Sequence, residues 1–303
     1  MKSLFQRLAR PVMPRARQRC DLVFVMAISE GEWVGVEDLL DSLHTYLDCR
    51  WRLIAVDDAT TDDTYEKLLD AGCWVVRNPE KLYLWGLDLT LRRGFREALR
   101  LFDSSFVVKI DPDALVIGPG LYRVLQDTFT AHPRVGIAGT YRIDWNGERR
   151  DLSYWRDRMK QRRKDLGKPL ERALANGYIL GEGVQGGCYA LRSTCLERID
   201  SAGWLEGAEG YRPRHIKGQQ IGEDSLITML VHAAGYEGLD IGGPGQPFGI
   251  WDVGLPMPPE DLIRQNRIVT HALKYHDDAS LAARAYFLLR RQLDRDTTIK
   301  HQE

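Results

Sequence analysis

Short, continuous apolar runs alternate along the chain with longer segments in which apolar residues recur at helical spacing. The short runs predict buried strands, and the longer segments predict amphipathic helices. The predicted strands cover residues 22–28, 53–56, 73–76, 106–110, 135–143 and 188–191. The predicted helices cover residues 34–47, 63–71, 87–102, 121–131 and 223–234. This alternation predicts an α/β fold with a mostly parallel sheet flanked by helices.

Aspartates stand at the ends of two predicted strands. Asp57 and Asp58 follow Val56, and Asp111 and Asp113 follow the run at 106–110. Ligands of open α/β sheets bind beyond the carboxyl ends of the strands, so we expect both pairs at one edge of the sheet. A further Asp-x-Asp triplet at 294–296 lies in a charged tail with no strand before it, which is typical of solvated surface.

The same region contains candidate N-caps for the helix predicted at 63–71. Asp63 and Glu66 have the spacing of a capping box, and Asp62 is a further N-cap candidate. If these residues cap the following helix, the strand-end pair Asp57 and Asp58 is left without a structural duty, which favours a role in ligand binding.

The composition fits a globular protein with one large domain or two small ones. The chain has 303 residues, of which 44% are hydrophobic and 28% charged. No apolar run approaches the length that spans a bilayer, and the leader lacks the apolar stretch of a secretory signal. We therefore expect a cytoplasmic protein. Its five cysteines are scattered without C-x-x-C spacing, which indicates neither a disulfide framework nor a zinc site.

Charge is distributed unevenly along the chain. Residues 1–20 carry lysine and arginine without an acidic residue, so they form either a frayed leader or a segment that contacts anionic lipid at the inner face of the membrane. Residues 156–172 are also basic, as a solvated helix or loop or as an arm that attracts anionic substrates. Residues 280–293 have apolar positions at helical spacing and are expected to pack on the domain, a partner or a membrane surface.

A series of motifs follows in order along the chain. The strand at 22–28 ends in Ser29-Glu30, and the later motifs are VDDATTDDT at 56–64, IDPDAL at 110–115, GGCYALRSTCLERI at 186–199, GEDS at 222–225 and THALKYH at 270–276. This series resembles the family-2 glycosyltransferases of the GT-A fold, a Rossmann-like fold that binds nucleotide-diphospho-sugars. The resemblance implies such a domain over residues 21–278, between a basic N-terminal extension at 1–20 and a C-terminal amphipathic helix and tail at 279–303.

The resemblance implies a metal-dependent, inverting transfer of a hexosyl or N-acetylhexosaminyl group. Asp113 would ligate Mn²⁺ or Mg²⁺, which prefer oxygen ligands, and Asp111 would reach the metal or the ribose. His271 would supply a late imidazole ligand, and His276 stays open as the alternative. The cation would neutralise the nucleoside diphosphate as it leaves.

The remaining roles are also implied by the resemblance. Asp224 would be the base that accepts the proton of the acceptor hydroxyl, with Glu223 supporting the site. The residues implied in nucleotide binding are Ala27, Glu30, Asp57, Asp58, Arg92, Asp111, Gly186, Gly187 and Lys274. Trp204 and Trp251 are candidates for stacking on sugar rings, with a place in the core as the alternative.

The implied partners are a nucleotide-diphosphate sugar, with a UDP-sugar favoured, and a glycan, lipid-linked or small-molecule acceptor, but no nucleic acid. The chain departs from the family pattern at Ser29, where asparagine is usual, and at Leu84-Trp85-Gly86. A phosphohydrolase of the haloacid dehalogenase type is the strongest rival, since it also places Asp-x-Asp after a strand. A non-catalytic binder of sugar nucleotides or carbohydrates is the other alternative.

Overall fold

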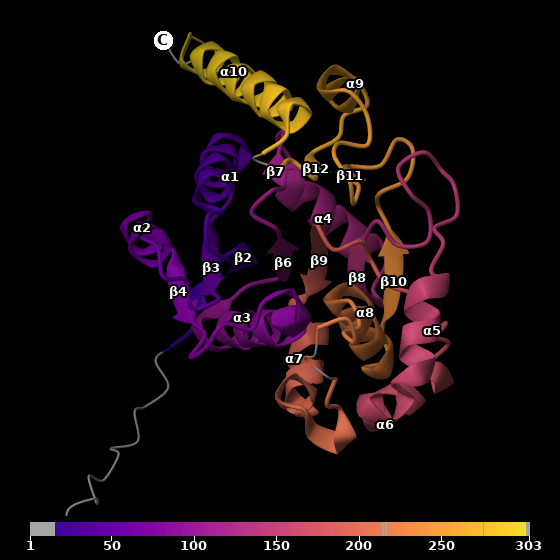
Figure 1. Ribbon diagram of the computed structural model, residues 1–303. Coiled ribbons are helices and arrows are strands. Elements are labelled where there is room, and N and C mark those ends of the chain that lie inside the picture. Colours follow the sequence, from indigo (N-terminus) through magenta and orange to yellow (C-terminus); the bar gives the residue numbers. More distant parts are fainter. Residues whose placement is uncertain (1–15, 214, 216, 275, 301–303) are drawn as a thin grey trace, which may run out of the picture.

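The computed structural model describes residues 16–213, 215, 217–274 and 276–300 (Figure 1). Most of the predicted basic extension, residues 1–15, lies outside this part of the chain. The central sheet has the strand order β10-β8-β9-β6-β2-β3-β4. Its strands are β2 (Leu22–Ile28), β3 (Trp51–Asp57), β4 (Trp74–Arg77), β6 (Phe106–Ile110), β8 (Val135–Gly139), β9 (Cys188–Arg192) and β10 (Glu237–Asp240). Only β9 runs antiparallel to its neighbours in this described sheet, so the prediction of a mostly parallel α/β sheet is confirmed.

The described residues also form a two-stranded sheet and a three-stranded sheet. β1 (Gln18–Arg19) pairs with β5 (Phe102–Asp103). The end of the predicted basic extension at 1–20 therefore forms part of the fold. β12 (Val269–His271) lies between β11 (Phe248–Ile250) and β7 (Leu115–Val116), antiparallel to β7. The first strand of this short sheet, β7, begins two residues after Asp113.

Helices cover both faces of the central sheet (Figure 1). They are α1 (Trp33–Tyr46), α2 (Thr64–Asp70), α3 (Leu87–Leu101), α4 (Leu121–Ala131), α5 (Ser153–Gln161), α6 (Arg163–Ala175), α7 (Ser193–Ser201), α8 (Glu223–Ala233), α9 (Pro259–Arg264) and α10 (Asp278–Lys300). Short 3₁₀ turns lie at Leu84–Gly86, Trp204–Glu206 and Ala208–Gly210. The basic stretch at 156–172 is therefore helical, whereas α7, α9 and the last strands were not predicted.

The core has two parts, one on each face of the sheet. Val23 and Val25 of β2 pack with α3, α6, α7 and α8, whereas Phe24 and Met26 pack with α1, α4 and the small sheet. A strand buried on both faces needs apolar residues at every position, which explains the continuous run at 22–28. α3 packs closely on β2, because a Cβ on Gly94 would lie 2.5 Å from Val25 Cγ1.

Two local predictions are wrong for identifiable reasons. The strand predicted at 135–143 ends at Gly139, because the backbone N–H groups of Tyr141, Arg142 and Ile143 donate to the Asp240 carboxylate instead of a strand. The predicted capping box does not form either. Asp63 makes no side-chain capping hydrogen bond at α2, and the carboxylate of Asp62 accepts from Thr64 N instead.

The C-terminal helix α10 packs on α1 with ion pairs in which the arginines are buried. Arg291 is 1% exposed and pairs with both Asp38 and Asp41, and Arg284 also pairs with Asp38. The amphipathic tail therefore packs on its own domain in this structure. No helix in the described part of the chain is long and apolar enough to cross a membrane.

Candidate active site

The carboxyl ends of β6, β2 and β3 lie side by side, because these strands are parallel neighbours. This register puts Asp57 opposite Ile28 and places Asp111 just beyond the end of β6. β9 runs the other way and starts at the same edge, where Cys188 pairs with Ile110. The backbone N–H of Asp111 donates to the carbonyl of Gly187 at 3.0 Å.

The structure brings Asp111, Asp113 and His271 together as a candidate metal group. One ligand atom from each lies within 4.8 Å of the others, although the histidine stands 160 positions after Asp111 in the sequence. The antiparallel pairing of β12 with β7 carries His271 there, and the backbone N–H of Leu273 then donates to the carbonyl of Asp113 at 2.8 Å. The imidazole Nε2 lies 3.1 Å from Asp113 Oδ1 and 3.9 Å from Asp111 Oδ2.

The imidazole of His271 is oriented for metal binding. Its Nδ1 lies 2.7 Å from the carbonyl oxygen of Trp251, which can only accept a hydrogen bond, so Nδ1 carries a proton and donates there. Nε2 faces the two carboxylates, where it can donate a hydrogen bond to Asp113 when protonated and can bind a cation when it is not. Gly187 makes room for the ring, since a Cβ there would lie 2.2 Å from His271 Cγ. Two carboxylates and a neutral imidazole fit a divalent cation such as Mn²⁺ or Mg²⁺.

Asp113 is also paired with Lys274 through its second oxygen. Burial raises the pKa of Asp113, but the hydrogen bond from His271 and the charge of Lys274 outweigh it and hold this pKa well below the ordinary value. Asp113 is therefore a carboxylate ready to bind a cation. His276 is exposed, so of the two histidines only His271 belongs to the group.

A buried lysine that the sequence analysis missed links this group to α8. Lys109 is fully buried in β6, and its Nζ lies 2.7 Å from Asp111 Oδ1, 2.6 Å from the Gly186 carbonyl and 3.5 Å from Glu223 Oε1. Burial lowers the pKa of Lys109, but Asp111 and Glu223 raise it by more, so the side chain stays charged. The sequence could have revealed this residue, because a lysine inside an apolar strand is expected to be buried, and lysine is rarely buried without a partner.

Glu223 and Asp224 begin α8 at the same edge. Burial raises the pKa of Glu223 to about 7, against the opposing charge of Lys109 and with the help of Asp224 and Asp111. Burial also raises the pKa of Asp224, whose Oδ1 accepts a hydrogen bond from Ser225 N at 2.7 Å. A Cβ on Gly186 would lie at an ordinary contact distance of 3.4 Å from Glu223 Oε1, so this position borders the acids without requiring a glycine.

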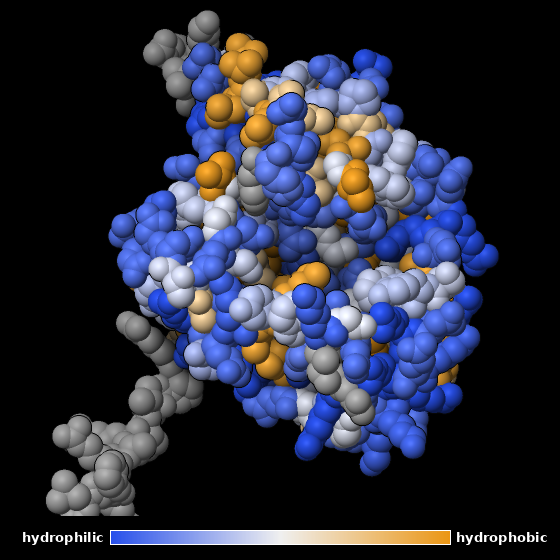
Figure 2. Space-filling model, viewed as in Figure 1, coloured by the Kyte–Doolittle hydropathy of each residue, from blue (hydrophilic) through white to orange (hydrophobic). Residues whose placement is uncertain are grey.

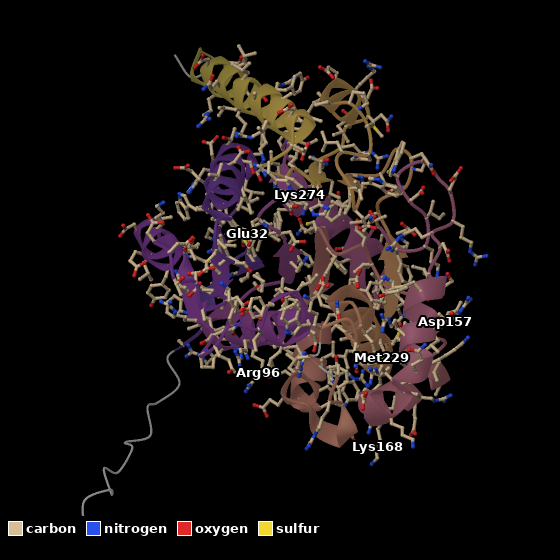
Figure 3. The ribbon with its side chains drawn as sticks, in the orientation of Figure 1. Glu32, Arg96, Asp157, Lys168, Met229 and Lys274 are labelled. Carbon is tan, nitrogen blue, oxygen red and sulfur yellow. The ribbon has the colours of Figure 1, made fainter. Side chains whose placement is uncertain are left out.

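Glu32 is a second residue that the sequence analysis missed. Burial raises its pKa to about 7, and the negative charges of Asp111 and Asp113 raise it further, while the hydrogen bond from Ser29 N at 2.7 Å opposes the rise. Figure 3 shows Glu32 and Lys274 as neighbours, one from the start of α1 and one after β12. A third carboxylate therefore lies near the metal group.

Asp58 and Asp57 have structural duties that the sequence analysis did not foresee. Asp58 accepts hydrogen bonds from Asn78 Nδ2, Leu82 N and Tyr83 N at 2.7–2.8 Å, and so holds the loop before α3. Asp57 is fully buried and accepts from the backbone of the turn that follows β3. The expectation that this pair lacks a structural role is wrong.

Three further nucleotide-binding candidates are Glu30, Ala27 and Arg92. Glu30 is exposed and bonded to Thr61 and Lys81, which lower its pKa to about 2. Ala27 is half-buried near the end of β2. Arg92 is not brought to the metal group by any contact among the described residues. It lies buried in α3, with Nη1 donating to the Leu205 carbonyl and Nε to Asp88.

The tryptophans divide into core and site. Trp204 is 2% exposed and belongs to the core, so it is not a sugar-stacking residue. Trp251 is half-buried beside His271. The face of the molecule in Figure 2 is hollowed near its centre, between the part with α10 and the part with α3 and α8.

No protein-family model and no curated protein matches the chain. Among solved structures, a mannosyltransferase from Pyrobaculum calidifontis in complex with GDP-Man and Mn²⁺ is similar at 16% identity and a TM-score of 0.43, over 76% of this chain and 57% of that one. Glucosyl-3-phosphoglycerate synthase from Mycobacterium tuberculosis, with Mn²⁺ and UDP, is similar at 16% identity and 0.41, over 74% and 70%. Residues 1–349 of TarS from S. aureus are similar at 15% identity and 0.46, over 81% and 63%. The chain thus spans little more than half the length of the mannosyltransferase.

Proposed function

We propose that this chain is a metal-dependent glycosyltransferase that moves a sugar from a nucleoside-diphosphate donor, a UDP-sugar in the favoured case, to an acceptor hydroxyl. The proposed catalytic domain covers residues 21–278. The observation that carries the proposal is the meeting of Asp111, Asp113 and His271 at the edge of the sheet where Glu223 also lies. Metal ligands and a pair of mostly buried acids with raised pKa values in one site are typical of catalysis rather than of structure.

In this proposal Asp113 and His271 hold the cation directly, and Asp111 holds it directly or through water. A divalent cation bound there supplies positive charge to the leaving diphosphate. Lys109 fixes Asp111 and the Gly186 backbone from beneath. Lys274 already pairs with Asp113 and is close enough to contact a diphosphate oxygen once a cation occupies the carboxylate.

Asp224 is the proposed base. It accepts the proton of the acceptor hydroxyl as that oxygen attacks the anomeric carbon, which gives inversion in a single displacement. Its raised pKa makes it a better proton acceptor than an exposed aspartate. Glu223 orients the acceptor or supports the base, and its contact with Lys109 keeps it in place.

The nucleoside is proposed to lie over the ends of β2 and β3, near Ala27, Glu30 and Asp57. Asp58 takes part by holding the loop at 78–83 in position, since its oxygens are occupied there. Arg92 stabilises α3 instead of contacting the nucleotide.

The experiment that tests the proposal is a calorimetric titration of UDP, GDP and dTDP, each with and without Mn²⁺ or Mg²⁺. We expect one nucleotide to bind only when the metal is present. A screen of the corresponding sugar donors for hydrolysis then identifies the sugar. If no nucleotide binds under any condition, the proposal fails.

The same samples separate the two alternatives. A phosphohydrolase would release inorganic phosphate from sugar phosphates and would not need a nucleotide. A non-catalytic binder would bind the donor without any turnover. The Asp224→Asn variant distinguishes the proposal from the binder, because it should retain nucleotide binding and lose the turnover that the wild-type chain shows.

A further inference from the structure

A basic pocket lies where α5 ends and α6 begins. Its volume is about 810 Å³. Five basic and three acidic side chains line it, which leaves a formal surplus of two positive charges, although the whole chain has a net charge of −1. Figure 2 shows that the surface over α5 and α6 is mostly hydrophilic. The basic side chains of this pocket, called the α6 pocket below, are those of Lys160, Arg162, Arg163, Lys164 and Lys168.

Three of these cations are open to a ligand. The side chains of Arg163, Lys164 and Lys168 are exposed, and they form no ion pair with any residue that the structure describes. A dissolved anion can therefore reach all three from the solvent. Charged donors of this kind form the stronger hydrogen bonds to phosphate and carboxylate oxygens.

Two of the three acids of the α6 pocket already have cationic partners. Asp165 lies 3.9 Å from Arg162, and Glu209 accepts a hydrogen bond from Arg172 at 3.0 Å. Within the described part of the chain, Glu171 is the one acid of the pocket without an ion pair. The unpaired cations therefore outnumber the unpaired acid by two charges. A phosphate group, with about two negative charges at pH 7 and three acceptor oxygens, matches this surplus better than a single carboxylate does.

The backbone of the α6 pocket is held in place without a ligand. α6 is kinked at Gly167, whose φ of +57° lies in the region that favours glycine. A Cβ at this position would lie 2.5 Å from the carbonyl oxygen of Glu209, so the wall of the pocket leaves no room for a side chain there. The backbone N–H of Arg212 donates to the carbonyl of Asp165 at 2.7 Å. A backbone that is already fixed lowers the ordering cost of binding.

The pocket contacts the segment that leads to the proposed base. Arg162 donates a hydrogen bond to the side chain of Gln219, five residues before Asp224. Five residues of extended chain span at most about 18 Å, which limits the distance between this contact and the base. α5 lies beside the same segment, since a Cβ on Gly222 would lie 3.2 Å from Trp155 Cη2. One extended molecule can therefore reach both the pocket and Asp224.

We propose that the α6 pocket binds a phosphate group of the acceptor, while a hydroxyl of the same molecule lies at Asp224. This inference rests on the proposed function and narrows its acceptor to a molecule that carries a phosphate group apart from the reacting hydroxyl. The diphosphate of the donor is assigned to the metal group. Glu223 contacts Lys109 on that side, whereas Gly222 borders α5, so the catalytic acids lie between the two anion sites. The α6 pocket therefore serves the other substrate.

The first test measures phosphate binding to the full chain without metal. Glycerol phosphate is titrated in EDTA and followed by phosphorus NMR, because the metal group then holds no cation that could bind the probe. We expect the phosphorus signal to broaden as the probe binds. A variant with Arg163→Gln, Lys164→Gln and Lys168→Gln, called the pocket variant, should weaken this binding at least about tenfold, because it loses the three unpaired cations.

The control variant has the same change in net charge. Arg123→Gln, Arg134→Gln and Arg264→Gln together remove three arginines that lie outside the pocket, with side chains 86%, 80% and 75% exposed. Phosphate binding by this control should stay within about twofold of wild type, because distant surface charges are screened by salt. Metal-dependent nucleotide binding should persist in both triple variants, which shows that each is folded.

A second measurement links the pocket to the acceptor. Phosphorylated maltodextrins, mannans and chitooligosaccharides are offered as acceptors, before and after phosphatase treatment, with the sugar donor that the wild-type chain uses. We expect the phosphatase to raise the KM for the acceptor about tenfold. The pocket variant should raise the KM for the untreated acceptor by a similar factor with little change in kcat, because the pocket adds binding energy without contacting the reacting atoms.

Several results would overturn the inference while leaving the proposed function intact. In the binding test they are no binding of glycerol phosphate by the wild-type chain, equal binding by the pocket variant, and displacement of the probe by an equal concentration of glycerate, its carboxylate counterpart. In the transfer assay they are equal use of phosphorylated and dephosphorylated acceptors, or no use of any phosphorylated acceptor. Failure of every nucleotide to bind is a different outcome, since it rejects the proposed function and with it the assignment of the phosphate to an acceptor.

Discussion

Replacement of Lys109 by methionine tests the electrostatic arrangement beneath the site. Methionine has a similar shape but carries no charge, so the variant removes the cation that faces Asp111 Oδ1 at 2.7 Å and Glu223 Oε1 at 3.5 Å. Removal of one partner from a buried ion pair costs about 3–5 kcal/mol, because the other charge stays buried and unpaired. The Asp111 side chain is 25% exposed and partly solvated, so we expect a loss of about 3 kcal/mol in the free energy of unfolding at pH 8.

The loss should depend on pH in a defined direction. The pKa of Glu223 in the folded chain is about 7, above its ordinary value of 4.5. A group with a raised pKa contributes stability below its unfolded pKa, and this contribution is lost as the pH rises through the folded value. Without Lys109 that folded pKa rises further. The difference between variant and wild type should therefore fall to about half at pH 5, where Glu223 is already protonated.

Guanidinium chloride unfolding at pH 5 and pH 8, followed by tryptophan fluorescence, measures both values. The matched control is Lys67→Met, because Lys67 is 41% exposed and its pairing with Asp63 is worth little. We expect this control to change stability by less than about 0.5 kcal/mol at either pH. A Lys109→Met variant as stable as the control, or one whose loss is larger at pH 5 than at pH 8, would refute the reasoning.

Three further predictions follow from contacts of the site and the C-terminal helix. Gly187→Ala should lower Mn²⁺ affinity about 10- to 100-fold in calorimetry, because the added Cβ would lie 2.2 Å from His271 Cγ and displace the ring. Asp224→Asn should lower turnover in a sugar-transfer assay by a factor on the order of 10²–10⁴ without loss of nucleotide binding, because the base is gone. Asp38→Ala should destabilise the chain by about 3 kcal/mol in thermal and chemical unfolding, because the buried Arg291 loses one of the two carboxylates that it pairs with.

Each of these predictions has its own control and its own contrary result. Gly118→Ala tests whether any added methyl near the small sheet weakens the metal site, since a Cβ there meets its nearest atom at an ordinary 3.6 Å. Equal Mn²⁺ affinity in Gly187→Ala and wild type would contradict the placement of His271. Full turnover in Asp224→Asn would remove it as the base. An unchanged free energy of unfolding in Asp38→Ala would show that the ion pairs between α10 and α1 do not stabilise the chain.

The sequence predicted the features that depend on neighbouring residues. Strand β2 was recognisable because a strand buried on both faces must be apolar throughout, and Asp111 and Asp113 stood out because they follow such a strand. The position of Glu223 and Asp224 at the start of a helix was also readable from local pattern. The α/β class followed from the alternation of these elements.

The missed features depend on contacts between distant segments. Lys109 looked like an irregularity in an apolar run until its partner Glu223 was placed beside it by the fold. Glu32 stood among other polar residues after β2, and only the start of α1 turns it toward Asp111 and Asp113. The direction of β9 could not be predicted either, because strand direction is set by the connections around it and not by its own residues.

The central claim is that Asp111, Asp113 and His271 bind a divalent cation. Electron paramagnetic resonance of Mn²⁺ tests it most directly, because the sharp signal of the free ion disappears on binding. The account predicts that the wild-type chain binds a single Mn²⁺ ion, that Asp113→Asn abolishes this binding, and that Asp296→Asn, in the second Asp-x-Asp triplet, does not change it. Equal Mn²⁺ binding by Asp113→Asn and wild type, or no binding by either, would contradict the account.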